Sequence, residues 1–324
     1  MNIAVLGAGA WGTALAIALA GEARVALWTR NPAHAEAMAA AGANDRYLPG
    51  FQLTGLRVTA DLAEAVAGAH LLIAAVPTSG FRDLLRRLDG VAAPLVWLCK
   101  GFEAGTMKLP HQVVAELWPH RQEVAALSGP SFAQEVASGQ PAALTLAAVD
   151  GEFARRVAHD LHRPRLRLYS STDVVGVEVG GALKNVIAIA AGISDGLGFG
   201  LNARAALITR GLAEITRLGV RLGGRAETFM GLSGMGDLIL TCTGDLSRNR
   251  RVGLRLAQGE SLEGILRELG HVAEGVSTAR EVVRLADDLG VEMPIAEAVR
   301  AILDQALPPR EAVSALLARD LRDE

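Results

Sequence analysis

The chain has 324 residues, half of them hydrophobic, with a net charge of −3 and an isoelectric point near 6.2. This length favours two domains, and the composition excludes a disordered or fibrous protein. The basic surplus typical of nucleic-acid binding is missing, so we expect no nucleic-acid partner. Cys99 and Cys242 have neither metal-ligand nor disulfide-framework spacing, which indicates no metal site and a reducing, cytoplasmic setting.

The first half of the chain alternates short apolar runs with helical patterns. The predicted strands span residues 2–7, 24–29, 70–76, 94–99, 123–128 and 142–149. The predicted helices span residues 11–21, 31–41, 61–67, 79–88, 109–118, 132–138 and 152–160. This alternation is typical of a parallel sheet with helices on both faces. We therefore expect α/β architecture, with a dinucleotide-binding Rossmann domain of the doubly wound type over residues 1–174.

From Gly176 onward the periodicity is mostly helical. The predicted helices span residues 203–219, 249–258, 261–269, 277–289, 294–306 and 310–321. The composition changes at the polar segment Tyr169–Asp173, so we expect an all-helical substrate-binding domain over residues 175–324. The apolar segment Val179–Ile193 contains Lys184 and is too short to cross a membrane, which favours a buried helix and no membrane insertion. No basic region or cleavage site precedes the first strand, so we expect no signal peptide.

A glycine-rich fingerprint follows the first strand directly. Gly7, Gly9 and Gly12 form G-x-G-x-x-G between an apolar strand and a helix rich in Ala and Leu, which is the context that this motif requires. The first glycine permits the tight turn, the second lets the backbone approach a pyrophosphate, and the third allows close contact between helix and strand. The motif predicts a bound dinucleotide; the alternative is a glycine-rich turn without a ligand.

The end of the second strand indicates which dinucleotide is used. A strictly NAD-selective site usually places Asp or Glu there to bind the ribose 2′-hydroxyl. This chain has Thr29, Arg30 and Asn31 instead, with no acid. Arg30 can pair with a 2′-phosphate, so we expect NADP to bind as well as NAD. The alternative is that Arg30 is a solvated loop cation.

Lysine is rare in this chain. Of 32 cationic side chains, only Lys100, Lys108 and Lys184 are lysines. Because an arginine cannot lose its proton at ordinary pH, a lysine retained in an arginine-rich chain can indicate a need for a titratable amine.

Several segments resemble bacterial NAD(P)-dependent glycerol-3-phosphate dehydrogenase, in the order of that family and over residues 3–295. They are residues 7–16, Asn44–Gly50, Lys100–Glu103, Leu127–Ala133, Ala182–Asn185, Gly231–Leu238, Thr241–Thr243, Ser247–Asn249 and Ala273–Gly275. The resemblance implies interconversion of dihydroxyacetone phosphate and sn-glycerol 3-phosphate by hydride transfer with NAD or NADP. It also implies a supply of glycerol phosphate for phospholipid synthesis, and a homodimer.

In this family the proton donor and acceptor corresponds to Lys184. A lysine serves in this role if burial or neighbouring charge lowers its pKa toward neutrality, and the Ala/Ile/Gly-rich surroundings would provide burial. The alternative is a lysine that extends from a buried helix to solvent. Asn185 can bond to the substrate or hold the lysine. Asp237 can accept a substrate hydroxyl or stabilise the Lys184 ammonium.

The remaining expected site residues follow from the resemblance and from their chemistry. Lys100 follows a strand end, where a cation can polarise the carbonyl and meet both cofactor and substrate, or be a surface charge. Further substrate residues are Gly129, Ser131, Thr241, Ser247, Arg248 and Asn249. Ser131 can also be a plain helix N-cap, and an arginine fork at a helix start suits a phosphate. The cofactor residues are Gly7, Gly9, Ala10, Trp11, Gly12, Arg30, Tyr47, Lys100, Ala133, Arg248, Val272 and Glu274.

Two other functions fit part of the sequence. A β-hydroxyacid dehydrogenase shares the two-domain plan and a catalytic lysine, but it has Asn four residues after that lysine, where this chain has Ala188. A non-catalytic nucleotide sensor would keep the three fingerprint glycines without needing Lys184, Asp237 and Arg248.

Overall fold

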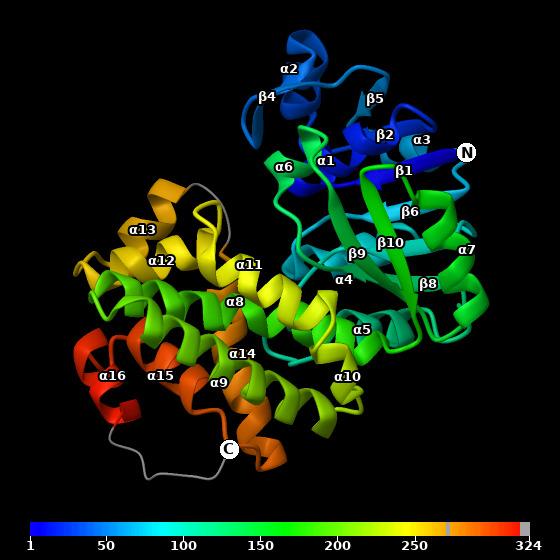
Figure 1. Cartoon of the computed structure of the whole chain (residues 1–324). Helices are drawn as coiled ribbons and strands as arrows, with labels where there is room; N and C mark the ends of the chain where they lie inside the picture. Colours follow the sequence, from blue (N-terminus) through cyan, green and yellow to red (C-terminus); the bar gives the residue numbers. More distant parts are fainter. Residues whose placement is uncertain (270–272, 318–324) are drawn as a thin grey trace. The chain divides into compact units, whose positions relative to one another are not determined.

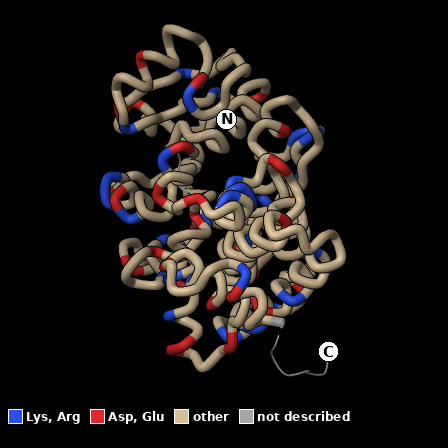
Figure 2. Tube along the Cα trace, turned by 90° about the vertical axis from the view of Figure 1, so that its left-hand side faces the viewer, with Lys and Arg blue, Asp and Glu red and all other residues tan. Residues whose placement is uncertain are grey.

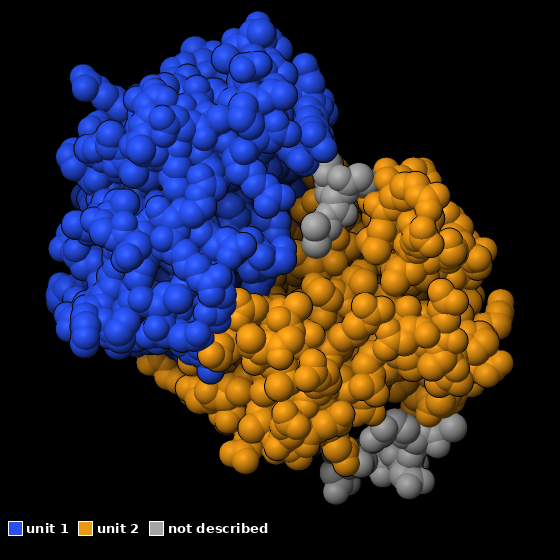
Figure 3. Space-filling view, turned by 180° about the vertical axis from the view of Figure 1, so that it is seen from behind, with its two compact units in different colours: residues 1–99, 110–174 blue, residues 100–109, 175–324 orange. Residues whose placement is uncertain are grey.

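The computed structural model describes residues 1–269 and 273–317, and the chain forms two compact units. The first unit comprises Met1–Cys99 and Pro110–Val174, and the second comprises Lys100–Leu109 and Val175–Glu324 (Figure 3). The segment 100–109 was expected in the first domain but belongs to the second unit. The reason is packing, because Phe102 and Leu109 are buried in the hydrophobic core of the second unit.

The first unit is built on an eight-stranded sheet (Figure 1). Its strands are β1 (Asn2–Leu6), β2 (Arg24–Trp28), β5 (Leu56–Thr59), β6 (Leu71–Ala74), β7 (Leu95–Trp97), β8 (Val124–Ser128), β9 (Ala142–Ala147) and β10 (Leu166–Ser171). The order is β10-β9-β8-β7-β6-β1-β2-β5, and every pair is parallel except β8 with β9. The run from β5 to β8 has the strand order of a Rossmann fold. The expected fold class is therefore confirmed.

Four strands were not predicted from the sequence. β3 (Ala43–Asn44) and β4 (Leu48–Gln52) form a separate antiparallel pair, while β5 and β10 are the two edges of the large sheet. The segment interpreted as a polar boundary thus lies partly in β10. An edge strand has a solvated side and can carry polar residues there, so its composition is like that of a loop.

Helices α1 to α7 connect the strands of the first unit. They are α1 (Ala10–Leu19), α2 (Pro32–Ala41), α3 (Leu62–Val66), α4 (Thr78–Arg87), α5 (Pro110–Leu117), α6 (Ala133–Ala137) and α7 (Gly151–Leu161). Ile3, Val5, Leu15 and Phe153 are buried in one cluster of apolar side chains from strands and helices. Burying such side chains stabilises a fold by about 1.5–3 kcal/mol each, which holds the fingerprint loop on a rigid base.

In the described part of the second unit every regular element is helical. The helices are α8 (Val174–Gly196), α9 (Gly200–Arg221), α10 (Ala226–Phe229), η1 (Leu232–Gly236), α11 (Asp237–Thr243), α12 (Arg248–Ala257), α13 (Leu262–Leu269), α14 (Glu274–Leu289), α15 (Pro294–Leu303) and α16 (Pro309–Leu317). The sequence did not predict α10, the π-helical turn η1 or α11. The glycines in and around η1 and α11 weaken the helical pattern of this segment.

Helix α8 is the centre of the second unit's core. By length and apolar composition it could cross a membrane, but 94% of its most apolar 18-residue stretch is buried inside the protein. Val186, Ile187 and Ile189 are almost completely buried within the hydrophobic core. The prediction of a buried helix at 179–193 is confirmed.

Helices α8 and α12 approach each other at backbone distance. A Cβ atom built on Gly253 would lie 2.0 Å from the carbonyl oxygen of Ile189, and one built on Gly192 would lie 2.0 Å from that of Arg250. Since both obstructing atoms belong to the backbone, they cannot move aside by changing a rotamer.

We expect Gly253→Ala to destabilise the second unit, because the added methyl group forces α8 and α12 apart. Overpacking of this kind costs about 1–3 kcal/mol. The measurement is the free energy of unfolding from urea titration. The matched control is Gly264→Ala in α13, whose Cβ would meet only the Ser261 hydroxyl at 3.1 Å. Equal stability of Gly253→Ala and the control would contradict the packing argument.

Candidate active site

The fingerprint loop joins β1 to α1 as predicted. Gly7 has φ 127°, and a Cβ on it would lie 2.4 Å from the Ala75 carbonyl oxygen. A Cβ on Gly12 would lie 2.0 Å from the Gly7 carbonyl oxygen, whereas a Cβ on Gly9 would have no atom within 4 Å. Gly7 and Gly12 are thus required by the chain itself, while Gly9 leaves open space beside the first turn of α1. The unsatisfied N–H groups of that turn suit a dinucleotide pyrophosphate.

A buried amide that the sequence interpretation did not single out supports this loop. Asn44 is fully buried, and its Nδ2 donates to the Ala8 carbonyl oxygen at 2.9 Å and to Thr13 Oγ1 at 2.7 Å. Its Oδ1 lies 3.0 Å from Nε2 of His34 in α2. Asn44 therefore joins the fingerprint loop to the helix that follows β2. The only sequence signal was its place in the family-like segment Asn44–Gly50.

The segment after β2 is where the ribose is read in Rossmann folds. Arg30 is exposed, and among the described residues it forms no hydrogen bond or ion pair, so its guanidinium is available to a ligand. Asn31 caps α2 by accepting from the His34 backbone N–H at 3.3 Å. The ring of Tyr47 meets the His34 ring edge-on, with centroids 5.2 Å apart.

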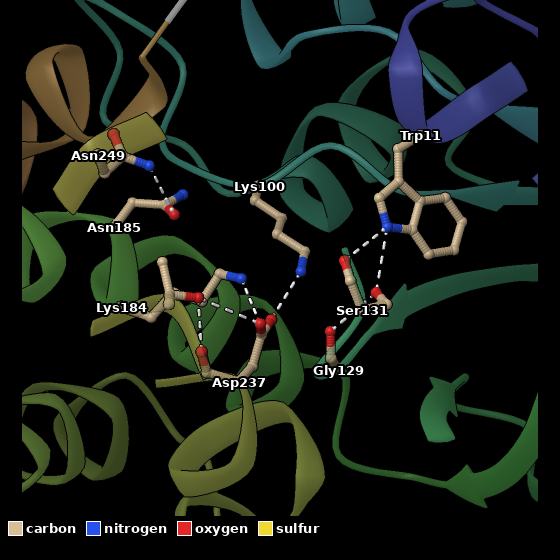
Figure 4. A network of polar contacts seen from close by, with 9 residues as sticks. Trp11, Lys100, Gly129, Ser131, Lys184, Asn185, Asp237 and Asn249 are labelled. Carbon is tan, nitrogen blue, oxygen red and sulfur yellow. Dashed lines mark hydrogen bonds and ion pairs between the residues drawn. The ribbon is translucent and has the colours of Figure 1, made fainter. Parts of the chain in front are cut away.

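Trp11 and Ser131 are linked within the first unit (Figure 4). Trp11 Nε1 donates to the Ser131 carbonyl oxygen at 3.0 Å and to its Oγ at 3.1 Å. The Ser131 hydroxyl donates to the Gly129 carbonyl oxygen at 3.2 Å. The interpretation of Ser131 as a plain N-cap is wrong, because the cap of α6 is Phe132 and has no side-chain hydrogen bond. Ala133 is the first residue of α6 and packs near Val136 and Leu48.

In the second unit, a close contact between α8 and η1 places Asp237. A Cβ on Gly180 would lie 2.6 Å from the Ser233 carbonyl oxygen. Gly180 and Lys184 are four residues apart and share one face of α8. The missing side chain lets η1 lie against that face, and Asp237 follows η1 directly. π-Helical turns often occur at functional sites.

Asp237 is the centre of a buried cluster of three charges (Figure 4). Its side chain is only 1% exposed. The Lys100 ammonium donates to Oδ2 at 2.7 Å, and the Lys184 ammonium donates to Oδ1. Thr241 Oγ1 donates to the Asp237 carbonyl oxygen at 2.6 Å and lies 3.4 Å from Oδ1. Of the two roles considered for Asp237, stabilising the Lys184 ammonium is the one that this contact provides.

Burial and the two lysines set the ionisation of this cluster. Burial lowers the pKa of Lys184 to about 8, Asp237 opposes the shift, and Lys100 adds to it. Burial raises the pKa of Asp237, but the two adjacent ammonium groups outweigh it and hold that pKa below its ordinary value. The cluster therefore contains a permanent carboxylate and an amine that can change its protonation near neutral pH.

The start of α12 is tied to the residue after Lys184. Asn249 Nδ2 donates to Asn185 Oδ1 at 3.0 Å, so Asn185 holds Asn249, and Asn249 Oδ1 accepts from the Gly275 backbone N–H at 3.1 Å. Ser247 is the N-cap of α12. Arg248 is exposed and has no hydrogen-bond or ion-pair partner among the described residues.

Glu274 begins α14 in the same unit. Burial raises its pKa, and Arg248, Lys100 and Lys184 lower it by less. Its neighbour Val272, which the sequence also assigned to the cofactor, lies outside the described residues.

The expected site residues thus fall into two groups. Within the first unit lie Gly7, Gly9, Ala10, Trp11, Gly12, Arg30, Tyr47, Gly129, Ser131 and Ala133. Within the second unit lie Lys100, Lys184, Asn185, Asp237, Thr241, Ser247, Arg248, Asn249 and Glu274.

The Asp237 cluster differs from the ion pairs of the protein surface. Figure 2 shows acidic and basic residues interspersed along the chain. In the exposed pair Arg57–Glu64 the side chains are 51% and 48% accessible, and such pairs contribute about 0–1 kcal/mol. A buried carboxylate with two ammonium partners is costly to assemble, which is typical of functional sites.

The first unit has the sheet and open glycine loop of a dinucleotide-binding protein, and the second has a buried lysine of lowered pKa, a group suited to the proton transfer of a dehydrogenase. The family model for the N-terminus of NAD-dependent glycerol-3-phosphate dehydrogenase matches residues 2–154, and the family model for its C-terminus matches residues 173–314. The chain belongs to this family.

Proteins similar to this chain in sequence and in structure agree with this family assignment. Glycerol-3-phosphate dehydrogenase [NAD(P)+] of Nitrosospira multiformis is 61% identical over 331 residues, covering 100% of this chain and 99% of the relative. That of Thiobacillus denitrificans is 62% identical over 327 residues, covering 100% of both chains. The crystal structure of glycerol-3-phosphate dehydrogenase from Coxiella burnetii has a TM-score of 0.92 at 42% identity, over 98% of this chain and 99% of that one. The protein is thus an oxidoreductase that uses NAD or NADP.

We expect Asp237→Asn to lower the pKa of Lys184 below about 8, because the carboxylate that favours its charged form is lost. With only three lysines in the chain, ¹⁵N-lysine labelling gives few Nζ resonances to titrate by NMR. Lys184→Arg identifies the resonance of interest, and Lys108→Arg is the control. An unchanged or raised Lys184 pKa would show that Asp237 does not set its charge.

Proposed function

We propose that the protein interconverts dihydroxyacetone phosphate and sn-glycerol 3-phosphate, with Lys184 as the proton donor and acceptor. The observation that carries this proposal is the buried contact of Lys184 and Lys100 with Asp237. Reduction of a ketone needs a proton donor beside the developing alkoxide, and oxidation of the alcohol needs a base at the same place. A lysine with a pKa of about 8 can serve both directions.

The three charged side chains have separate tasks in this mechanism. When bound, the nicotinamide cofactor would supply the hydride or take it up. The Lys184 ammonium donates a proton to the substrate oxygen in reduction, and the neutral amine removes it in oxidation. Asp237 holds the Lys184 ammonium in place, and Lys100 adds a second positive charge that polarises the carbonyl.

The phosphate group is assigned to the start of α12. Arg248 offers a fork of N–H donors, and Ser247 and Asn249 flank it at the first turn, where backbone N–H groups favour an anion. Gly129, Ser131, Asn185 and Thr241 are proposed as further substrate contacts, the first two through backbone N–H and hydroxyl groups.

The cofactor is assigned to the fingerprint loop and to Arg30. The open space at Gly9 suits the pyrophosphate, and the exposed Arg30 suits the 2′-phosphate of NADP. Further cofactor contacts are proposed from the family resemblance. They are Ala10, Trp11, Tyr47, Lys100, Ala133, Arg248, Val272 and Glu274.

The proposed cellular role is to supply glycerol phosphate for phospholipid synthesis in the cytoplasm. The family resemblance also favours a homodimer, which light scattering on the purified protein tests directly. The activity itself is tested by the loss of NADPH absorbance on addition of dihydroxyacetone phosphate. A nucleotide sensor would bind NADPH without consuming it, and a β-hydroxyacid dehydrogenase would not use the phosphorylated ketone.

Replacement of Lys184 by Ala should abolish turnover and leave NADPH binding nearly intact. A general acid–base group contributes about 10²–10⁴ in rate. Steady-state kinetics and NADPH fluorescence titration measure the two effects, and Lys108→Ala is the matched lysine control. Turnover of Lys184→Ala within about threefold of wild type would be incompatible with its proposed role, since the loss of a general acid–base group should be far larger.

Replacement of Arg248 by Ala should raise the KM for dihydroxyacetone phosphate far more than that for NADPH. A hydrogen bond to a charged group contributes about 1.5–3 kcal/mol, which corresponds to roughly tenfold or more. Arg251→Ala is the control, because Arg251 is an exposed arginine of the same helix. If both variants have the wild-type KM at saturating NADPH, the phosphate is bound elsewhere.

Replacement of Arg30 by Asp should move the preference from NADPH toward NADH. The new carboxylate repels a 2′-phosphate and can accept the 2′-hydroxyl of NADH. Loss of the charged Arg30 contact and gain of this repulsion should each weaken NADPH binding by about 1–3 kcal/mol. The measurement is the ratio of kcat/KM for the two cofactors, which in the wild type should be at least as high for NADPH. A ratio that Arg30→Asp leaves unchanged would assign cofactor choice to another residue, such as Asn31 or Tyr47.

A further inference from the structure

A second charged cluster lies at the start of α12, beside the proposed phosphate site. Asp195, near the end of α8, is only 12% exposed. Its Oδ2 accepts from Arg250 Nε at 2.9 Å and lies 2.8 Å from Arg250 Nη2. It also accepts from Arg204 Nη1, in α9, at 3.0 Å. One carboxylate therefore ties three helices of the second unit together.

The same pair fixes α12 against the helix that carries Lys184. Asp195 lies 11 residues after Lys184 in α8, which is about three helical turns. Between these levels, Asn249 bonds to Asn185, and Gly253 lets the two backbones meet. The Arg250–Asp195 contact is thus a further attachment of α12 to α8, made by a side chain in the first turn of α12.

The cluster also gives different surroundings to Arg248 and Arg250, which are two positions apart in the sequence. The side chain of Arg250 is 11% exposed, and its guanidinium engages Asp195 on one side and Asp245, at 3.0 Å, on the other. Arg248 is exposed and has no such partner among the described residues. Arg250 is neutralised by carboxylates, so the guanidinium that remains for an anion is that of Arg248.

We propose that Asp195 is a positioning residue for the substrate phosphate. By holding Arg250, it keeps the first turn of α12 in the orientation that presents Ser247, Arg248 and Asn249 to the phosphate. This inference rests on the proposed function of those three residues. Asp195 itself contacts neither substrate nor cofactor, and it acts through Arg250.

The first test is the kinetics of Asp195→Asn, which keeps the shape of the side chain and removes its charge. The KM for dihydroxyacetone phosphate should rise about tenfold, the loss expected for one charge-assisted contact, while kcat changes less than about threefold. The matched control is Asp245→Asn, because Asp245 pairs with the same arginine but is 99% exposed. Its KM should stay within about twofold of wild type.

A double-mutant cycle separates this inference from the proposed function. If Asp195 acts through the Arg248 site, the effects of Asp195→Asn and Arg248→Ala on the substrate KM are not additive. A raised KM in Arg248→Ala with an unchanged KM in Asp195→Asn, or additive effects, overturns the inference alone. An unchanged KM in Arg248→Ala rejects the phosphate site itself.

A second variant, Arg250→Met, serves as the control for effects on folding, because it leaves Asp195 paired with Arg204. It should reproduce the rise in substrate KM while retaining the wild-type unfolding temperature to within a few degrees. If Asp195→Asn and Arg250→Met lose cooperative unfolding or lower kcat in parallel with 1/KM, the cluster is merely structural and the inference is overturned.

Discussion

The second unit depends on one buried carboxylate. Asp237 is almost inaccessible to solvent, and an isolated charge there would be strongly destabilising. Lys100 and Lys184 satisfy one oxygen each, and in return the carboxylate keeps two ammonium groups together that would otherwise repel each other. The segment 100–109 joins the second unit through its core contacts, which brings Lys100 to this carboxylate. The same cluster of three charges therefore holds parts of this unit together and carries its proposed chemistry.

Lysine and arginine are used for different purposes in this chain. The structure places two of its three lysines on Asp237, where an amine of lowered pKa can exchange a proton. Arginines, which stay charged, occupy the positions proposed to bind phosphate groups, Arg30 and Arg248. The rarity of lysine predicted a need for a titratable amine, but composition could not say which lysines would meet.

The two units hold their proposed ligand-binding helix starts in similar ways. In the first unit, the backbone of the glycine loop is held by contacts at Gly7 and Gly12 and by the buried amide of Asn44. In the second, the first turn of α12 is held by Asn185 and Asp195. In both cases polar groups behind a helix N-terminus fix it, and a fixed helix start of this kind is the preorganisation that the proposed anion sites require.

The sequence by itself determined what local patterns encode. Hydrophobic periodicity gave the central strands β1, β2, β6, β7 and β8, the long helices and the buried character of α8, and the fingerprint gave the dinucleotide loop. These features depend on residues close together in the chain. Family-like motifs gave the site residues, which remain assignments by resemblance and chemistry.

Only the tertiary structure decided which distant residues meet. Edge strands such as β10 and the π-helical turn η1 have weak local signals, because their backbone is fixed by neighbours elsewhere in the chain. The same holds for the transfer of Lys100 to the second unit and for the roles of Asn44 and Asp195. Asn44 donates to residues 36 and 31 positions away, and Asp195 accepts from Arg250, 55 positions away. These hydrogen bonds therefore exist only after the chain has folded.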